Sequence, residues 1–266
     1  MFFTGASGFE EGYAKKDNLE IYYRDYGPSD GIPVLLVMGL GGQLTFWPPY
    51  MIKSLQDSGY RPIAYDNRDM GLSSRFNSKP TFLSNYLKYY LNIPIKSEYK
   101  LDDMANDAVM LLDYLNIDQC HVIGMSMGGM ISQRMVSTSE DKFISYVLIS
   151  SMAKAPDAKT APKGELRSLI ETRSFKNLSM DERVNRSLKI YKILASKNDP
   201  SFNESEFRKE AISNINRSPN DTGFSRQLIA ILADKDRYNE VKNLSLIHIS
   251  EPTRRRGISY AVFCLK

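Results

Sequence analysis

One five-residue motif has the residue types and spacing of a hydrolytic nucleophile. Gly124, Met125, Ser126, Met127 and Gly128 fit the pattern G-x-S-x-G. An apolar segment leads into this motif and a helical pattern leads out of it, which is the context of a serine on a tight strand-to-helix turn. Small residues at both ends let the backbone close around the serine, and the helix start favours developing negative charge. The motif predicts Ser126 as a nucleophile; the alternative is a glycine-rich turn with an idle serine.

A glycine-rich loop, Gly39–Gly42, follows another apolar segment. In a parallel sheet this loop lies at the same edge as Ser126, where open α/β sheets bind ligands. The backbone N–H groups of Leu40 and Met127 are therefore predicted to form an oxyanion hole. The loop does not fit G-x-G-x-x-G and no Walker sequence occurs, so nucleotide binding is not favoured. Four glycines support the two turns: Gly39, Gly41, Gly124 and Gly128.

A serine hydroxyl needs a base within about 3 Å to remove its proton. The sequence offers only His121 and His248. His121 stands five residues before Ser126 on the same predicted strand, so its Cα lies roughly 16 Å away at about 3.3 Å per residue. It is interpreted as a strand-end side chain. His248 follows Ser126 in the chain, as the order of serine, acid and histidine demands, and is the remaining candidate.

The carboxylate that orients such a base cannot be placed on the sequence. Asp66 and Asp69 follow an early strand and are interpreted as structural. Asp234 and Asp236 belong to the end of a predicted helix and the segment after it. Because none of these four acids follows a recognisable later strand, the acid stays unassigned. The base stays unassigned as well, with His248 as its remaining candidate.

The first half of the chain alternates strands with helices. Continuous apolar runs such as residues 33–38 suit strands that are buried on both faces of a parallel sheet. The clearest helix, over residues 101–115, has Asp102 and Asp103 in its first turn, where the helix dipole favours acids. This order predicts an α/β fold with a mostly parallel, doubly wound sheet. Strands are predicted at 19–26, 33–38, 62–65, 120–125 and 144–149, and helices at 48–58, 101–115 and 128–136.

The pattern changes after residue 151. Residues 152–242 are polar and charged, and no strand is predicted there. Helices are predicted at 163–173, 180–195, 204–213 and 225–234. The expected organisation is a core over residues 1–151, a helical cap or lid over 152–243 and a tail over 244–266. A separate small helical domain is the alternative for the middle part.

The composition excludes several classes of protein. A chain of 266 residues with 42% hydrophobic and 25% charged residues is neither disordered nor fibrous. Its net charge of +4 is dispersed, without a basic stripe interleaved with aromatics, so nucleic acid is not an expected partner. Two cysteines make neither a disulfide framework nor a Cys-type zinc site. No apolar run approaches the ~20 residues that span a bilayer, and no secretory signal begins the chain, so a cytoplasmic protein is expected.

Three ordered stretches match a known superfamily. They are Val37–Gln43, Tyr65–Ser73 and His121–Met130, and the helix at 101–107 matches as well. Over roughly residues 15–243 the chain resembles the α/β-hydrolase superfamily, and within it the aclacinomycin methylesterase-like esterases. The resemblance implies the α/β-hydrolase fold, Ser126 as nucleophile, the amides of Leu40 and Met127 as oxyanion donors, and a helical cap from about residue 152. Met38 stands where many relatives have a histidine that is usually structural.

Residues 244–266 are predicted to be a non-native tail. Leu244–Arg254 and Ile258–Lys266 read like the translated parts of a sequencing-library transposon adapter. Genuine sequence would then stop near Asn243. In relatives the catalytic acid and histidine lie beyond that point, so both are expected to be absent, as are the last strands and a helix. An exposed apolar sheet edge and poor solubility would follow. The alternative is a divergent native tail with His248 as the base.

These features predict a serine hydrolase as the parent protein. It would cleave a carboxylic ester of a small or medium organic substrate through an acyl-enzyme on Ser126, without a cofactor or a metal. Relatives with an aspartate at this position form alkyl-enzyme esters, whereas serine favours acyl transfer. A cofactor-free peroxidase, a C–C bond hydrolase or an amidase shares the same turn. The chain as written is expected to turn over little because the base is missing; a non-catalytic binding protein is the contrasting alternative.

Overall fold

The computed structural model describes residues 8–79, 82–91, 93–155, 164, 178–195, 202–219, 222–242 and 247–250. A seven-stranded sheet in the order β1-β2-β4-β3-β5-β6-β7 forms its centre. β1 and β2 form an antiparallel hairpin, β2 pairs antiparallel with β4, and β4, β3, β5, β6 and β7 run parallel. The strands are β1 (Glu10–Lys16), β2 (Leu19–Asp25), β3 (Ile32–Val37), β4 (Tyr60–Tyr65), β5 (Cys120–Met125), β6 (Phe143–Ile149) and β7 (Ile247–Ser250). The parallel strands therefore share one carboxyl edge.

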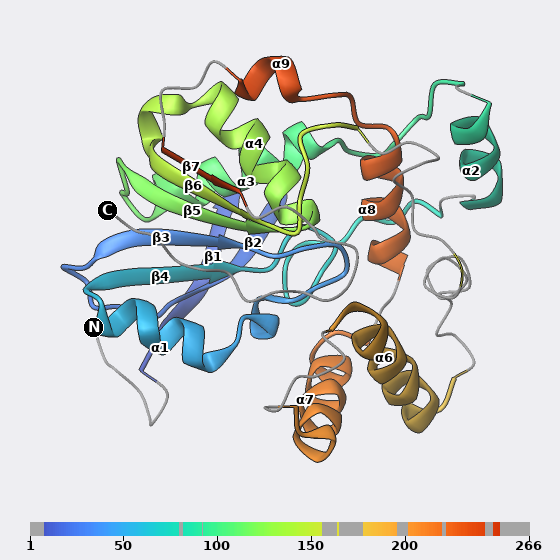
Figure 1. Ribbon diagram of the computed structural model, residues 1–266, viewed down its shortest axis with the longest axis horizontal. Coiled ribbons are helices and arrows are strands. Elements are labelled where there is room, and N and C mark those ends of the chain that lie inside the picture. The colour runs from blue at the N-terminus through green and yellow to red at the C-terminus, as the bar shows by residue number, and fades with distance from the viewer. Residues whose placement is uncertain are drawn as a thin grey trace.

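Helices cover both faces of the sheet (Figure 1). α1 (Pro49–Asp57) lies on one face, and α3 (Leu101–Tyr114) and α4 (Met127–Thr138) lie on the other. α1 and α3 bury the apolar faces that their sequence periodicity provides, whereas α4 is buried on all sides from Met127 to Val136. Each side of the sheet has its own hydrophobic core. The predicted α/β fold is confirmed, and each strand and helix predicted within residues 1–151 has its counterpart.

Three further helices form a layer at the carboxyl edge of the sheet: α6 (Met180–Leu194), α7 (Glu204–Arg217) and α8 (Thr222–Leu232). α6 begins with a capping box in which Ser179 and Glu182 exchange side-chain and backbone hydrogen bonds. α6 and α7 pack as a pair, and α8 stands between the sheet and α2 (Phe82–Tyr90) (Figure 1). We refer to α6, α7 and α8 as the helical layer. The helix predicted at 163–173 lies outside the described residues except for Gly164.

The sheet extends one strand further than the sequence predicts. β7 pairs in parallel with β6 from Ser145 to Leu148. The expectation of an unpaired edge at β6 is therefore wrong over these residues. The physical reason is that the open N–H and C=O groups of an edge strand pair with any extended segment nearby, with little dependence on its side chains.

Two buried ion pairs hold the helical layer on the core. Arg226 of α8 donates from Nε and Nη2 to both carboxylate oxygens of Asp69, at 2.8 and 2.7 Å. The side chains of Arg226 and Asp69 are 2% and 0% exposed. Arg217, at the end of α7, approaches Asp66 to 2.7 Å. A buried charge is tolerated only where it is paired, so these contacts fix the positions of α7 and α8 on the loop after β4.

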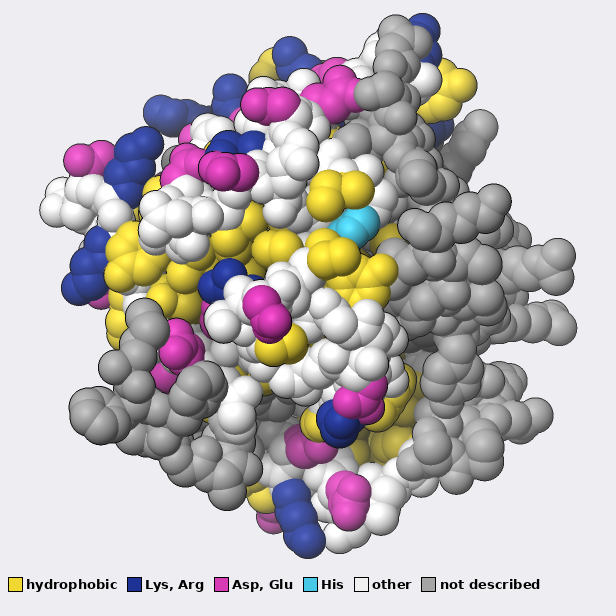
Figure 2. Space-filling view, turned by 90° about the vertical axis from the view of Figure 1, so that its left-hand side faces the viewer, with side chains coloured by type: hydrophobic (Ala, Val, Ile, Leu, Met, Phe, Trp, Pro, Cys, Tyr) yellow, Lys and Arg dark blue, Asp and Glu magenta, His cyan; other side chains and the backbone are white. Residues whose placement is uncertain are grey.

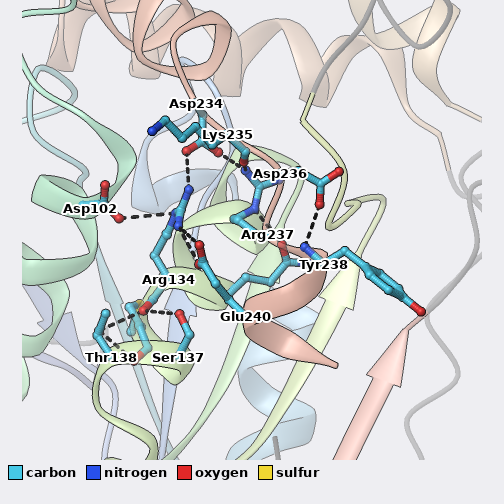
Figure 3. A network of polar contacts seen from close by, with 12 residues as sticks. Asp102, Arg134, Ser137, Thr138, Asp234, Lys235, Asp236, Arg237, Tyr238 and Glu240 are labelled. Carbon is cyan, nitrogen blue, oxygen red and sulfur yellow. Dashed lines mark hydrogen bonds and ion pairs between the residues drawn. The ribbon is translucent and has the colours of Figure 1, made fainter. Parts of the chain in front are cut away.

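The segment after α8 is tied to α4 by a third charged network (Figure 3). Arg134 of α4 pairs with Asp234 and Glu240, and Arg237 pairs with Asp234. Arg237 is fully buried, and desolvation together with the nearby Arg134 lowers its pKa to about 10. It therefore stays protonated at neutral pH. The short helix α9 (Tyr238–Val241) follows this network and packs on α4.

Figure 2 shows the end of the molecule that lies opposite the carboxyl edge of the sheet. Hydrophobic side chains on this face lie among charged ones. Ile32, at the start of β3, and Ile144, near the start of β6, are both exposed. The loops at the carboxyl edge lie at the other end of the molecule. Within the described ranges, no helix is long and apolar enough to cross a membrane.

The Arg226–Asp69 pair predicts a large cost for a single truncation. Arg226→Met leaves the Asp69 carboxylate buried without its partner, so the free energy of unfolding should fall by about 3–5 kcal/mol. Urea denaturation measures it. Lys53→Ala is the control, because it removes an exposed pair with Asp57 and should cost less than about 0.5 kcal/mol. A loss below about 1 kcal/mol for Arg226→Met would contradict the anchoring role.

Candidate active site

Ser126 lies in a strained turn between β5 and α4. It is the N-cap residue of α4. Its backbone angles are φ 53° and ψ −118°, a conformation that residues other than glycine rarely adopt. Its N–H donates to the carbonyl of Ile149, and its carbonyl accepts from the N–H of Gly129, both at 2.9 Å. The side chain caps no helix amide and the residue is exposed. The turn thus presents a free hydroxyl at the carboxyl edge.

The two glycines of the motif are required by close packing. A Cβ on Gly128 would lie 2.0 Å from the carbonyl oxygen of Val37, so α4 begins directly against the end of β3. A Cβ on Gly124 would lie 2.5 Å from Ser132 Oγ and 2.6 Å from the carbonyl oxygen of Gly128. No other residue fits at either position without displacing backbone. The spacing G-x-S-x-G is therefore a packing requirement of this turn.

The loop after β3 lies against Ser126. Gly42 N–H donates to the carbonyl of Gly39 at 3.1 Å and closes a tight turn over Leu40 and Gly41. Gly41 has φ 68°, the positive value that glycine supplies at the third position of a type II turn. A Cβ on Gly39 would lie 3.2 Å from the Cβ of Ser126. The structure therefore brings together the two segments that the sequence predicted to meet.

Two backbone N–H groups beside Ser126 have no hydrogen-bond partner among the described residues. They belong to Leu40, in the turn, and Met127, the first residue of α4. The N-terminus of α4 adds the positive end of the helix dipole. Unpaired N–H groups at a helix N-terminus are suited to bind an anion or a developing oxyanion.

Neither histidine of the chain lies at this edge. His121 is in β5, where its Nδ1 lies 2.7 Å from Ser145 Oγ and its ring packs edge-on against Tyr60. His248 is in β7, in register with Tyr146 and, through it, with Val122. Val122 stands four residues before Ser126 in β5. The row formed by His248, Tyr146 and Val122 therefore lies about 13 Å from Ser126 along the strand direction. Neither histidine therefore lies at the level of Ser126 in the described strands.

The four acids considered in the sequence are held in structural contacts. Asp66 is fully buried and accepts from the N–H groups of Leu44 and Leu72 at 2.8 and 3.0 Å. Asp69 and Asp234 are paired with arginines, as described above. Asp236 accepts from the N–H of Tyr238 at 2.8 Å. Among the described residues, no cluster of acids, histidines and cysteines is arranged to hold a metal ion.

Comparison with known proteins establishes the family. A family model described as the alpha/beta hydrolase fold matches residues 32–178, more than half of the chain. The chain belongs to the α/β-hydrolase family. The crystal structure of a carboxylesterase from Nitrososphaera gargenis resembles this hydrolase with a TM-score of 0.65 at 19% identity, over 90% of this chain and 79% of that one.

Two proteins similar in sequence to this α/β-hydrolase are named for different reactions. A Variovorax paradoxus protein named "Putative carbamate hydrolase RutD" is 33% identical over 143 residues, which are 54% of this chain and 46% of that protein. Rhodomycin D methylesterase DauP of Streptomyces sp. strain C5 is 25% identical over 213 residues, which are 74% of this chain and 66% of that protein. The chain thus spans about half to two thirds of the length of these relatives.

Two polar side chains that contact the candidate site were not recognised in the sequence. Ser151, just after β6, donates its hydroxyl to the carbonyl of Ser126 at 2.8 Å. Gln227 of α8 accepts a hydrogen bond from Gly41 N–H. Gln227 lies on the same apolar face of α8 as Phe224 and Ile231, at spacings of three and four. A polar residue on an apolar helix face was the available signal for Gln227; Ser151 gives none.

The burial of His121 predicts a pH-dependent contribution to stability. Desolvation lowers the pKa of this imidazole below its usual 6.5. Below about pH 6.5 the unfolded chain binds a proton at His121 that the folded chain refuses, so the free energy of unfolding falls as pH decreases. His121→Gln should remove this part of the slope. Urea denaturation between pH 8 and pH 5 measures it, and an unchanged slope in the variant would contradict a buried neutral imidazole.

Proposed function

We propose that this α/β-hydrolase is a serine hydrolase in which Ser126 is the nucleophile. Its Oγ attacks an acyl carbonyl, the leaving group departs with a proton, and water then cleaves the acyl-enzyme. The observation that carries the proposal is the backbone of Ser126 at φ 53° and ψ −118°, with an exposed hydroxyl that caps no amide. A strained, exposed serine at a strand-to-helix turn has no structural purpose of its own.

The amides of Leu40 and Met127 are proposed as the oxyanion hole. Both N–H groups lack a partner among the described residues, and both flank Ser126. They would donate to the carbonyl oxygen as it gains negative charge. Losing one such donor typically lowers kcat by about 10²–10³. Gly39, Gly41, Gly124 and Gly128 shape the two turns that carry these amides.

The proposed substrate is a carboxylic ester of a small or medium organic molecule, cleaved without a cofactor. The methylesterase and carboxylesterase among the similar proteins support an ester bond. A carbamate or amide is the second candidate, supported by the 33% identity to the relative named for carbamate hydrolysis. Residues 152–243, which include the helical layer, would form a cap that selects among these substrates. The helical layer borders the carboxyl edge, where the substrate would bind.

The base and the acid are proposed to be missing from this chain. No histidine in the described part lies at the level of Ser126, and the nearby acids have structural partners. Residues 244–266 are proposed to be a non-native tail, so turnover by this chain would be slight. A serine without a base reacts mainly as the small alkoxide fraction that rises with pH.

The pH dependence of phosphonate labelling tests both proposals. A fluorophosphonate should label Ser126, with a rate that rises through pH 6–10 without a plateau near pH 7. Mass spectrometry of the peptides locates the label, and Ser126→Ala should abolish it. No labelling at any pH would contradict the nucleophile. A plateau near pH 7, with steady turnover of a p-nitrophenyl ester, would contradict the missing base, and His248→Gln would then show whether His248 supplies it.

A further inference from the structure

Gln227 joins the helical layer to the loop beside Ser126. Its Oε1 accepts from Gly41 N–H and its Nε2 donates to the carbonyl of Arg68, both at 2.9 Å. The residue is 0% exposed. Its two partners also fix the orientation of the amide group, because a flipped amide would face an N–H with its NH₂ and a carbonyl with its oxygen. One side chain thus bridges α8, the loop after β3 and the loop after β4.

The hydrogen bond to Gly41 acts on the peptide unit at the centre of the tight turn. Gly42 N–H closes the turn on Gly39, and Gly41 takes the positive φ of a type II turn. Rotation of the central peptide would convert this turn into type I, and would carry the N–H of Gly41 away from Gln227. The bond therefore fixes the central peptide of the turn, which joins Leu40 to Gly41.

The helix that carries Gln227 is itself fixed on the core. The neighbouring residue, Arg226, forms the buried bidentate pair with Asp69. One turn earlier, a Cβ on Gly223 would lie 2.1 Å from the carbonyl oxygen of Asp69, so the helix backbone touches the core directly. α8 can therefore hold the loop at Gly41 only while it is seated on Asp69.

We propose that Gln227 is a positioning residue that sets the oxyanion loop from the helical layer. The proposal rests on the assignment of Leu40 and Ser126 given above. Seating of α8 would then be coupled to stabilisation of the tetrahedral intermediate, although Gln227 touches neither the substrate nor Ser126. A buried acceptor that is removed leaves Gly41 N–H unsatisfied, which favours other turn conformations.

Backbone amide exchange tests this coupling without requiring activity. Hydrogen exchange of peptides spanning residues 38–46 is compared among wild type, Gln227→Met and Gln227→Glu. The matched control is Gln133→Met, because Gln133 is also buried and accepts one hydrogen bond, from Arg237, away from the loop. Gln227→Met should speed exchange of these peptides about tenfold relative to Gln133→Met, as expected for one lost hydrogen bond. Gln227→Glu keeps the acceptor and should stay closer to wild type.

The rate of fluorophosphonate labelling at Ser126 is the second readout. Gln227→Met should label about tenfold more slowly than Gln133→Met, with partial recovery in Gln227→Glu. Equal exchange of residues 38–46 in Gln227→Met and Gln133→Met would overturn the positioning role. Faster exchange with unchanged labelling would overturn its link to the oxyanion. Absence of labelling in wild type would refute the proposed nucleophile instead, while the exchange comparison would still decide whether Gln227 holds the loop.

Discussion

The backbone conformation of Ser126 is the constraint around which the carboxyl edge is built. Holding a non-glycine residue at φ 53° and ψ −118° costs about 1–3 kcal/mol, so surrounding contacts must enforce it. Ile149 and Gly129 bond its backbone on both sides, and Gly128 lets α4 start against Val37. Any looser packing would let the turn relax. The exposed hydroxyl and the adjacent free amide of Met127 both follow from this enforced turn.

The helical layer is attached by buried charges as well as by apolar packing, since Ala230 and Ile231 of α8 belong to the same hydrophobic core as α3 and α4. Arg217 and Arg226 each reach an aspartate that is fully buried, and Gln227 lies between them and the loop at Gly41. Buried pairs of this kind add little net stability compared with apolar packing, but they are costly to break and strict in geometry. They suit a layer that must be seated in one position relative to the loop at Gly41. The same seating supplies the acceptor for Gly41.

Much of the parallel core was predictable because its signals are local. Apolar runs marked β3, β5 and β6, and the helical periodicity of residues 101–115 marked α3. β1 was not predicted because its sequence, EEGYAKK, buries only Ala14 and forms by pairing with β2. β7 was not predicted because residues 244–266 were interpreted as a non-native tail, although its sequence IHIS alternates apolar and polar residues. α2 was not predicted, because no element was assigned to residues 82–90 from the sequence.

The candidate site likewise contains residues that could be predicted from the sequence and residues that could not. The places of Ser126, Leu40 and Met127 in the two turns could be predicted because close backbone packing demands glycines at fixed spacings around them. Gln227 could not, since its role depends on a contact between residues 186 positions apart. Asp66 and Asp69 were interpreted as structural from the sequence, but their arginine partners in α7 and α8 could not be predicted.

The most direct measurement of the central claim is the free energy of unfolding of Ser126→Gly. At an ordinary helix N-cap, replacing serine by glycine costs a few tenths of a kcal/mol. Here glycine relieves about 1–3 kcal/mol of strain and loses about 0.5–1 kcal/mol of backbone entropy. Urea denaturation should therefore find Ser126→Gly about 1 kcal/mol more stable than wild type. The free energy of unfolding of Ser126→Ala should not exceed that of wild type. A Ser126→Gly protein equal to or less stable than wild type would contradict a strained nucleophile turn.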